Sequence, residues 1–367
     1  AARPKVDASE LAAAPAGGSA GPTSAYVAEQ RAFRLFRNLQ PLEGGEAVPE
    51  GLPATSKVSA RDSGEAVLLE RRSAVLNLSL QRYGVGGIGA STQKRLQRAL
   101  LSHALTEPMR QQLGVKHQRG LLLFGPPGCG KTLIARGLSN ALSATTLQYV
   151  TAAEINDKWF GVSDKKMKAL FEPALESQRK GRVADLHMIV MDEIDALTAE
   201  RSKSDARNHE SALNVLLASL DGFNENGQTL VVGLTNRKDK IDAALLRPGR
   251  LGVHIEVGLP DEQGRLEVLE IHAGALASGD FLAPDASLSE VAARTDGLSG
   301  ADLCQLVSDA VAHALLQRGS ALPLGGELPK HFVDRAAFES ALQEAMEQRC
   351  QPLPQASGAG GPEAADL

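Results

Sequence analysis

Apolar residues gather along this chain in two kinds of pattern. At 121–124, 188–191 and 230–234 they form short continuous runs that end at turn-forming or charged residues. Such runs are typical of strands that are buried on both faces of a parallel sheet. The stretch 92–113 instead has apolar residues at helical spacing, and its predicted apolar face consists of Leu96, Ala99, Leu100 and Ala104. Strands that alternate with helices predict an α/β fold, a parallel sheet covered by helices.

From residue 261 onward the patterns are helical. Two pairs, Ser287 with Glu290 and Ser299 with Asp302, have the spacing of a capping box at a helix N-terminus. The second pair precedes a helix whose predicted apolar face consists of Leu303, Leu306, Val307, Ala310, Val311 and Ala314. We therefore expect an α/β domain over 73–262, followed by a small helical domain over 263–349.

Both ends of the chain have the composition of linkers. Residues 1–72 are rich in Ala, Gly, Pro and Ser, and we expect mostly disordered linker there, or the remnant of an N-terminal domain. Within them, the stretch 26–39 sets three arginines around two phenylalanines, which suits either a basic amphipathic helix or the remnant of a folded module. Nearby acidic residues favour the remnant. We expect 350–367 to be a disordered tail.

Composition narrows the class of protein. The 367 residues are 43% hydrophobic, enough for a sizeable core, and their formal net charge of −5 argues against a protein that binds nucleic acid through its phosphates. No apolar run reaches the roughly 18 residues of a membrane span. Cys129, Cys304 and Cys350 are spaced unlike a metal site or a disulfide scaffold, which favours the cytoplasm. The alanine at position 1 predicts a fragment or a processed product.

The first apolar run continues into GPPGCGKT at 125–132, which fills every fixed position of a phosphate-binding loop. Its glycines let successive backbone amides turn inward around phosphate groups, and the following helix points its N-terminus at the anion. Lys131 is expected to reach the β- and γ-phosphates, and Thr132 to offer its hydroxyl to Mg²⁺. The loop predicts that a nucleotide is bound by Pro127, Gly128, Cys129, Gly130, Lys131, Thr132 and Leu133.

Upstream of this loop, GVGGIG at 84–89 matches the glycine pattern of a dinucleotide-binding turn. That fold requires a second strand that ends in an acidic residue about 20 residues later, whereas 92–113 has a helical pattern. We therefore interpret these glycines as a tight turn, or as a close approach of the backbone to a ligand.

The second apolar run ends in two carboxylates, Asp192 and Glu193. Ligands of open α/β sheets bind at the carboxyl ends of the strands, so this position suits catalysis. We predict that Asp192 holds Mg²⁺ through water and that Glu193 polarises the attacking water.

The third apolar run is followed by Asn236, whose amide suits a contact with the γ-phosphate or the attacking water. Farther along, LLRPGRL at 245–251 sets Arg247 and Arg250 on either side of a Pro-Gly turn. Two guanidinium groups on a stiff turn favour bidentate contact with phosphate.

Taken together, GPPGCGKT, MDEIDAL, GLTNR and ALLRPGRL resemble the motifs of hexameric, substrate-remodelling AAA+ ATPases, in their order and spacing. The resemblance covers about 73–349. Four further features are similar to the first ATPase domain of the N-ethylmaleimide-sensitive fusion factor family: RRSAVLNLSLQRYGVGGIG, the cysteine of the phosphate loop, ESQRKGRVADLH and VGLPDEQGRLEVLEIH. The family implies a P-loop α/β domain with a helical lid. It also has a complete N-terminal domain and a second ATPase domain, so the resemblance implies that this chain is truncated.

The resemblance also assigns residues to roles. It implies that adenine is contacted by the region of Val85, Gly86 and Gly87 and by Val268 and His272. It also implies that Gly300 and Ala301 bind the nucleotide. It makes Asn236 a sensor, and Arg247 and Arg250 arginine fingers that act on the nucleotide of the neighbouring subunit. It places Trp159, Phe160 and Gly161 in a pore loop that grips the substrate chain, although the family usually has tyrosine in place of Trp159.

The function that the resemblance implies is hydrolysis of ATP with Mg²⁺ by a homo-hexamer that disassembles SNARE complexes through an adaptor. We expect a cytoplasmic protein that associates with Golgi or vesicle membranes only through its partners. Two alternatives stay open: a general protein-remodelling ATPase with other substrates, and a nucleotide-gated assembly module with little turnover.

Overall fold

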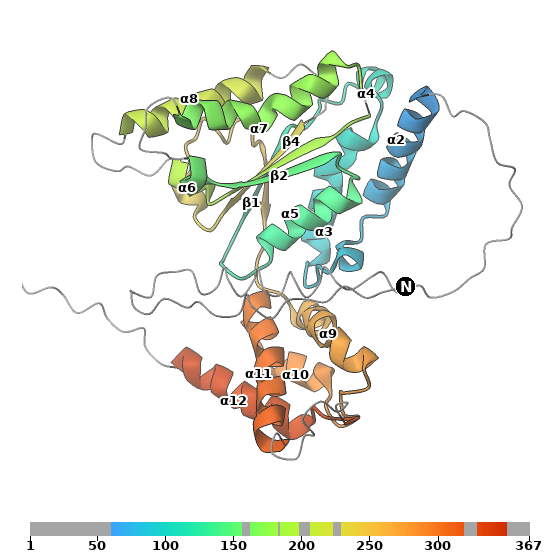
Figure 1. Cartoon of the computed structure of the whole chain (residues 1–367), viewed down its shortest axis with the longest axis vertical. Helices are drawn as coiled ribbons and strands as arrows, with labels where there is room; N and C mark the ends of the chain where they lie inside the picture. Colours follow the sequence, from blue (N-terminus) through green and yellow to red (C-terminus); the bar gives the residue numbers. More distant parts are fainter. Residues whose placement is uncertain are drawn as a thin grey trace, which may run out of the picture. The chain divides into compact units, whose positions relative to one another are not determined.

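Five parallel strands form the central sheet, in the order β2-β3-β4-β1-β5 (Figure 1). They are β1 (Gly120–Phe124), β2 (Thr146–Thr151), β3 (His187–Asp192), β4 (Thr229–Thr235) and β5 (Val253–Glu256). This computed structural model describes residues 60–155, 162–182, 184–197, 206–222, 229–318 and 329–350, all within the unit 58–367. The predicted α/β class with a parallel sheet is confirmed, and the three apolar runs form β1, β3 and β4.

The sheet is buried on both faces, which explains why its inner strands have continuous apolar runs. Successive side chains of a strand point to opposite faces. Leu121 and Leu123 accordingly belong to the core on one face, and Leu122 belongs to the core on the other. Every residue of β4, in the middle of the sheet, is buried.

Helices from two parts of the chain cover the two faces (Figure 1). On one face, α2, α3 and α5 contribute to the core, and on the other α7, α8 and η4 do so. We call the sheet and the helices around it the body. Its α-helices are α2 (Ala60–Leu76), α3 (Ala90–Leu100), α4 (Glu107–Leu113), α5 (Lys131–Ala141), α6 (Ala152–Ile155), α7 (Val162–Arg179) and α8 (Ala206–Gly222). Its 3₁₀ helices are η2 (Leu80–Tyr83), η3 (Leu101–Ala104), η4 (Ile194–Leu197) and η5 (Lys238–Lys240).

The helix expected over 92–113 is divided into α3, η3 and α4. Leu105 is extended, Thr106 is the N-cap of α4, and Pro108 occupies the first turn, where a proline needs no backbone N–H. The predicted apolar face is nevertheless buried in the core, since Leu96, Ala99, Leu100 and Ala104 are all inaccessible. Periodicity identified the buried face, and the break followed from local capping.

Helix α2 begins inside the stretch that composition predicted as linker, and it crosses the predicted domain boundary at residue 73. It is attached to the body through Arg71, which is buried. The guanidinium donates hydrogen bonds to the carbonyl oxygens of Leu142, at 2.8 Å, and of Ala184, at 3.1 Å. A buried charge needs such acceptors, so these bonds fix α2 beside the ends of α5 and β3.

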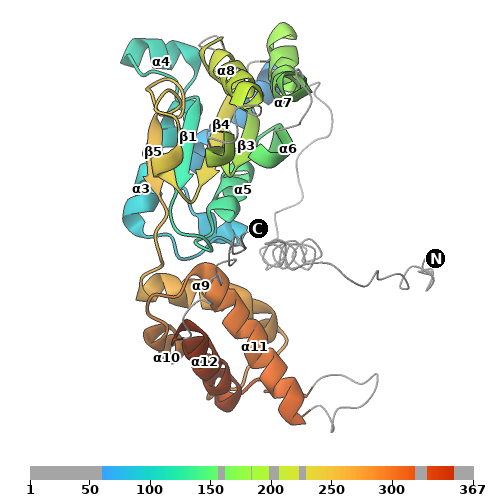
Figure 2. The same ribbon diagram turned by 90° about the vertical axis from the view of Figure 1, so that its left-hand side faces the viewer.

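Four helices follow β5 and pack around a separate apolar core, and we call them the lid (Figure 2). They are α9 (Glu262–Ser278), α10 (Leu288–Arg294), α11 (Gly300–Arg318) and α12 (Arg335–Cys350). The predicted apolar face of α11 lies in this core, with Val311 partly buried. Both predicted capping serines accept a hydrogen bond from the backbone N–H three residues later, at 3.3 Å in each case. Only Asp302 completes the reciprocal box, by accepting from the backbone N–H of Ser299 at 2.8 Å.

Three predictions lie outside the described residues: the structured stretch 26–39, the pore loop with Trp159, Phe160 and Gly161, and the tail 351–367. Among the residues that the structure does describe, no helix is long and apolar enough to cross a membrane.

Candidate functional site

The topology of the sheet gathers the predicted catalytic residues at one edge (Figure 2). All five strands are parallel, so their carboxyl ends lie at the same edge, and β4 lies between β1 and β3. The phosphate loop follows β1, Asp192 ends β3, Glu193 follows it, and Asn236 comes directly after β4. Residues that are about 60 to 100 positions apart in the sequence therefore line one edge, as expected for open α/β sheets.

The phosphate loop has a backbone that only glycine adopts at low cost. Gly125, Gly128 and Gly130 have φ angles of 149°, 76° and 79°. A Cβ atom on Gly125 would lie 2.0 Å from the carbonyl oxygen of Val257. Gly130 is the N-cap of α5, so the loop leads directly into a helix N-terminus. This arrangement fits an anion, because backbone amides and the helix dipole both favour negative charge there.

Lys131, the first residue of α5, is largely buried, and its ammonium group lies against the phosphate loop. It donates hydrogen bonds to the carbonyl oxygens of Gly125, at 3.0 Å, and Pro126, at 2.7 Å. Phosphate oxygens are stronger acceptors for an ammonium group than carbonyl oxygens. The lysine is therefore held at the site where a phosphate would compete for it.

Thr132 and Asp192 meet across the edge, at an Oγ1 to Oδ2 distance of 3.3 Å. The other carboxylate oxygen of Asp192, Oδ1, accepts the backbone N–H of Glu193 at 2.8 Å. A hydroxyl and a carboxylate are the hard oxygen donors that Mg²⁺ prefers, and Mg²⁺ usually takes few protein ligands and completes its shell with phosphates and water. One hydroxyl and one carboxylate are few protein ligands, so this donor pair fits Mg²⁺ that is bound together with a nucleotide.

Glu193 is exposed and has a left-handed backbone, with φ of 51°. This conformation costs a residue other than glycine roughly 1–2 kcal/mol, and such strain is common at functional sites. It turns the chain sharply from β3 into η4, where the Glu193 carbonyl accepts from the Ala196 N–H at 2.8 Å. The carboxylate is thereby left at the edge of the sheet.

Asn236 is exposed, and its loop is fixed by its neighbours. The hydroxyl of Thr235 donates to Asp195 at 2.7 Å and accepts the backbone N–H of Arg237 at 2.9 Å. Asp195 also forms an ion pair with Arg237, at 3.6 Å. The amide of Asn236 therefore projects from a short turn that is bonded on both sides.

The structure separates the two arginines of the LLRPGRL turn. The guanidinium of Arg250 is held by both carboxylate oxygens of Asp221, at the end of α8, and by the carbonyl oxygen of Ala244 at 2.7 Å. Asp221 raises the pKa of Arg250, and Arg250 lowers the pKa of Asp221. The side chain of Arg247 is exposed, and its guanidinium makes no hydrogen bond or ion pair with the described part of the chain. Of the two guanidinium groups, that of Arg247 is the one left accessible to a separate molecule.

Lid residues contact the phosphate loop. The backbone N–H of Ala301 donates to the carbonyl oxygen of Gly128 at 3.0 Å, and a Cβ atom on Gly128 would lie 2.6 Å from the hydroxyl oxygen of Ser299. Gly300 is also close to the loop, since a Cβ atom on Gly300 would lie 3.2 Å from the carbonyl oxygen of Gly128. The capping box that begins α11 therefore packs directly on the loop, together with the predicted residues Gly300 and Ala301.

The glycines of GVGGIG approach helix α9 closely. Cβ atoms on Gly86 and Gly87 would lie 2.8 Å from Ile271 and 2.9 Å from Val268. The backbone N–H of Gly87 donates to the Glu267 carboxylate at 3.1 Å. The close approach that these glycines make is therefore to helix α9, and an approach to a ligand stays a prediction. The predicted residue Val85 is different, because it is buried in the core against α5.

Two predicted site residues have shifted pKa values. Burial lowers the pKa of His272, so its imidazole is neutral near pH 7. Burial raises the pKa of the Cys129 thiol, with Asp302 acting in the same direction and Lys131 opposing it. Cys129 is partly exposed within the loop, whereas Leu133 is exposed on α5.

Several residues of the site carried no recognisable sequence signal. Tyr149 of β2 donates a short hydrogen bond to Asp192, Glu267 accepts from Gly87, and Asp221 fixes Arg250. Each acts through a partner that is distant in the sequence. Ser299 and Asp302 were found as a capping box, and that motif does not reveal the contact with the phosphate loop.

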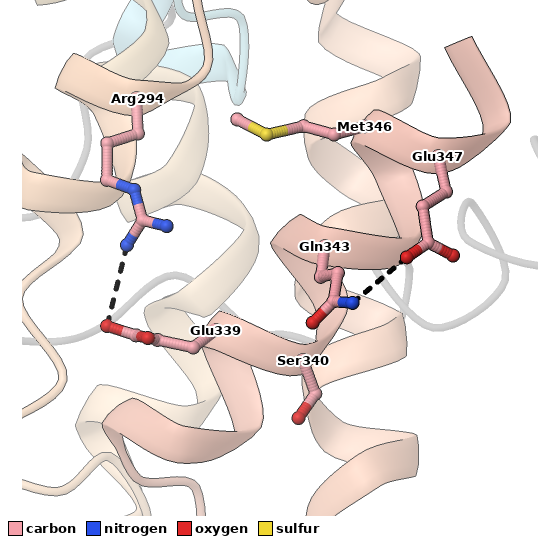
Figure 3. A pocket seen from close by; sticks show the side chains of 6 residues that line it. All are labelled: Arg294, Glu339, Ser340, Gln343, Met346 and Glu347. Carbon is pink, nitrogen blue, oxygen red and sulfur yellow. Dashed lines mark hydrogen bonds and ion pairs between the residues drawn. The ribbon is translucent and has the colours of Figure 1, made fainter. Parts of the chain in front are cut away.

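The lid also contains a shallow hollow between α10 and α12 (Figure 3). Arg294 and Glu339 form an ion pair across it at 3.5 Å, and Gln343 donates to Glu347 at 2.9 Å. The remaining lining residues are Ser340 and Met346. None of these residues was predicted to bind nucleotide, and exposed pairs of this kind contribute little to binding or stability.

Comparison with known proteins agrees with this geometry. Residues 121–259 match the ATPase family associated with various cellular activities (AAA), and residues 285–322 match the AAA+ lid domain. A vesicle-fusing ATPase of Arabidopsis thaliana is 40% identical over 69% of this chain and 35% of its own length. The vesicular-fusion protein SEC18 of Saccharomyces cerevisiae is 37% identical over 76% of this chain and 38% of its own length.

A cell division cycle protein 48 homologue of Archaeoglobus fulgidus is 35% identical over 73% of this chain and 34% of its own length. The chain thus spans about a third of the length of these relatives. Both parts match in this order, and the same residues carry an intact phosphate loop and paired carboxylates at one sheet edge. The body of this chain thus matches the AAA family of ATPases and the lid matches the AAA+ lid domain, and the two together are similar to the vesicle-fusing ATPases.

Proposed function

We propose that this chain hydrolyses ATP with Mg²⁺ as one subunit of a homo-hexameric ring, and that the ring disassembles SNARE complexes through an adaptor during vesicle fusion. The sheet edge that gathers Lys131, Thr132, Asp192 and Glu193 supports the chemistry. The substrate is supported by the similarity to proteins named vesicle-fusing ATPase and vesicular-fusion protein. This function predicts a cytoplasmic protein that reaches Golgi or vesicle membranes through its partners.

In the proposed reaction, Lys131 leaves the carbonyl oxygens of its own loop and donates to the β- and γ-phosphates. Thr132 and Asp192 would hold Mg²⁺, which would neutralise charge on the phosphates. Glu193 accepts a proton from the attacking water, and its exposed position at the strand end suits that task. Asn236 orients the water or the γ-phosphate from the end of β4.

The base of the nucleotide is proposed to lie between the body and the lid. Gly86 and Gly87 form one side, and Val268 and His272 form the other, which agrees with the close approach of Gly87 to Val268. Val85 can contribute only its backbone, because its side chain is buried in the core against α5. Gly300 and Ala301 are proposed to contact the nucleotide beside the phosphate loop, which the bond from Ala301 to Gly128 supports. A neutral His272 suits contact with an uncharged base.

Assembly completes the proposed site. Arg247 contacts the nucleotide of the neighbouring subunit, because its guanidinium is exposed and makes no hydrogen bond or ion pair with the described residues. Arg250 was predicted as a second finger, and its bonds to Asp221 and Ala244 support a different role, holding the turn that carries Arg247. Trp159, Phe160 and Gly161 are proposed to line the pore and grip the substrate.

Disassembly of a purified SNARE complex tests this function directly. The chain, an adaptor protein, MgATP and a fluorescently labelled four-helix SNARE complex are mixed, and separation of the labels is followed over time. We expect separation that requires ATP hydrolysis and the adaptor. ATP hydrolysis without separation, under conditions in which a vesicle-fusing ATPase separates the complex, contradicts the proposed substrate but leaves the chemistry intact.

A second function is favoured by one observation. The similarity to the cell division cycle protein 48 homologue extends over nearly the same part of the chain as the similarity to the vesicle-fusing ATPases. A general remodelling ATPase therefore remains a candidate. Unfolding of a tagged model protein without any adaptor distinguishes it from the first proposal.

A further inference from the structure

Three side chains from two elements, β2 and α5, form a cluster around the Asp192 carboxylate at the end of β3. Tyr149 lies on β2, which pairs with β3 so that Thr151 is opposite Asp192. Tyr149 is two residues before Thr151, and side chains two positions apart on a strand project to the same face of the sheet. Thr132 and Arg136 lie one turn apart on α5, which covers that face. The ring of Tyr149 packs against the same core as α5.

Three donors converge on the two oxygens of Asp192. The Glu193 backbone N–H donates to Oδ1 at 2.8 Å, and the Thr132 hydroxyl donates to Oδ2 at 3.3 Å. The Tyr149 phenol donates to Oδ2 through a short hydrogen bond. The guanidinium of Arg136 stands 5.5 Å from the centroid of the Tyr149 ring, a cation–π distance that steadies the ring.

The phenol has one useful orientation beside the Asp192 carboxylate. Its O–H can donate, whereas an ionised carboxylate can only accept, so the O–H is directed at the carboxylate oxygen.

We propose that Tyr149 is a positioning residue for magnesium: its phenol fixes the Asp192 carboxylate so that Oδ2 meets the Thr132 hydroxyl. A hydroxyl whose proton is engaged by Asp192 presents its lone pairs outward, and lone pairs are what a cation requires. Without the phenol, the carboxylate gains rotational freedom about its last torsion, and the hydroxyl loses a fixed acceptor. Partners that orient metal-binding groups are typically worth about 10- to 100-fold in metal affinity or activity.

This inference rests on the assignment of Thr132 and Asp192 to Mg²⁺ in the proposed function. The competing explanation is that Tyr149 is a core ring whose hydroxyl has merely found an acceptor. The two explanations differ in one measurable respect. A core ring affects stability and all nucleotide binding alike, whereas a positioning residue affects only the part of binding that depends on Mg²⁺.

The test replaces the phenol by a phenyl ring, Tyr149→Phe, in the full chain. The affinity for a fluorescent ATP analogue is measured with EDTA and across a series of Mg²⁺ concentrations. We expect the affinity in EDTA to stay within about twofold of wild type, while the Mg²⁺ concentration for half-maximal response rises about 10-fold. Thermal unfolding reports whether the ring still packs.

Tyr83→Phe is the matched control, because it removes the same atom from an exposed tyrosine whose hydroxyl makes no hydrogen bond in the described structure. It should leave both quantities unchanged. An unchanged Mg²⁺ response in Tyr149→Phe overturns the inference, and so does an equal loss of affinity with and without Mg²⁺. If the wild-type chain itself shows no Mg²⁺-dependent binding, the magnesium site of the proposed function fails, and the inference fails with it.

Discussion

At the scale of single residues, the chemistry depends on which atoms the sheet edge presents. Lys131 and Glu193 are expected to fail in different ways when they are replaced. The lysine is proposed to bind phosphate and the glutamate to act on water, so one change should affect binding and the other turnover. Glu193 comes after β3, whereas Lys131 comes after β1 in the phosphate loop.

Glu193→Gln should bind ATP almost as wild type does and hydrolyse it about 10²- to 10⁴-fold more slowly, because an amide is a poor general base. Lys131→Ala should lose ATP affinity, because the loop keeps its amides but loses its ammonium group. Equilibrium binding and steady-state phosphate release measure the two effects. Equal defects of both variants in both measurements would exclude the assigned roles.

Alkylation of Cys129 should inactivate the protein, because an adduct on the partly exposed thiol occupies the phosphate loop. The thiolate is the nucleophile, and the raised pKa of Cys129 keeps the thiolate fraction small near pH 7. While the pH is below that pKa, the rate of inactivation by a maleimide should therefore increase about tenfold each time the pH is raised by one unit.

ATP bound beforehand should protect against this reagent, and Cys129→Ser should resist it. Cys304→Ser is the control, since burial raises the pKa of that thiol as well but Cys304 lies on α11 in the lid. Wild-type sensitivity in Cys129→Ser would show that another group is responsible.

At the scale of elements, the N-terminus of α11 both begins a helix and supports the phosphate loop. Ser299→Ala removes the capping hydroxyl and should lower the free energy of unfolding by about 1 kcal/mol. It should also weaken ATP binding, because the Ala301 N–H that donates to Gly128 belongs to the same first turn. Urea unfolding and nucleotide titration measure the two effects.

Ser287→Ala is the matched control, since Ser287 caps α10 through the same bond to the residue three positions later. It should lower stability by a similar amount and leave ATP affinity unchanged. If both variants bind ATP equally well, the cap of α11 supports only its helix.

At the scale of the whole molecule, stability should fall in acid because of two neighbouring histidines. His103 and His117 stack edge to face with ring centroids 4.3 Å apart. Burial lowers the pKa of His103 well below its usual value and that of His117 to about 3. Arg110 can only donate, so it donates to Nδ1 of His117, and the remaining proton lies on Nε2, which is buried without a partner.

The unfolded chain binds protons at these histidines near pH 6.5, and the folded chain does not. The free energy of unfolding is therefore at its full value above about pH 6.5. It should decline toward pH 3, by up to about 1.4 kcal/mol per pH unit for each histidine. Urea unfolding between pH 7.5 and 4.5 measures the slope. His117→Gln should reduce it, whereas His331→Gln, at an exposed position, should not; equal slopes in all three proteins would contradict this origin.

Assembly is the second property of the whole molecule. If Arg247 acts on the neighbouring subunit, ATPase activity per subunit should increase with protein concentration. Its loss should reduce turnover by about 10³- to 10⁵-fold, as for other arginine fingers.

Mixing two variants tests whether Arg247 acts across the interface. Arg247→Ala and Lys131→Ala subunits should each be inactive for a different reason, so a mixed ring has some interfaces with both groups intact. Mixing should restore part of the activity, and no recovery in a demonstrated mixed assembly would place Arg247 in its own subunit's site.

The sequence alone determined the features that depend on local chemistry. Continuous apolar runs identified β1, β3 and β4, because only strands buried on both faces need them. GPPGCGKT identified its own loop, because each position has a separate physical requirement. Helical periodicity found the buried faces of α3 and α11. It missed the interruption before α4, where Leu105 and Thr106 are extended and Pro108 lies in the first turn of a new helix.

Only the tertiary structure decided which distant residues meet. Nothing near Tyr149 in the sequence indicates that its phenol reaches Asp192, because the pairing register of β2 with β3 brings them together. Arg247 and Arg250 look equivalent along the chain, and the position of Asp221 at the end of α8 makes them different. A short motif records the requirements of one segment, whereas a hydrogen bond between segments depends on how the whole chain packs.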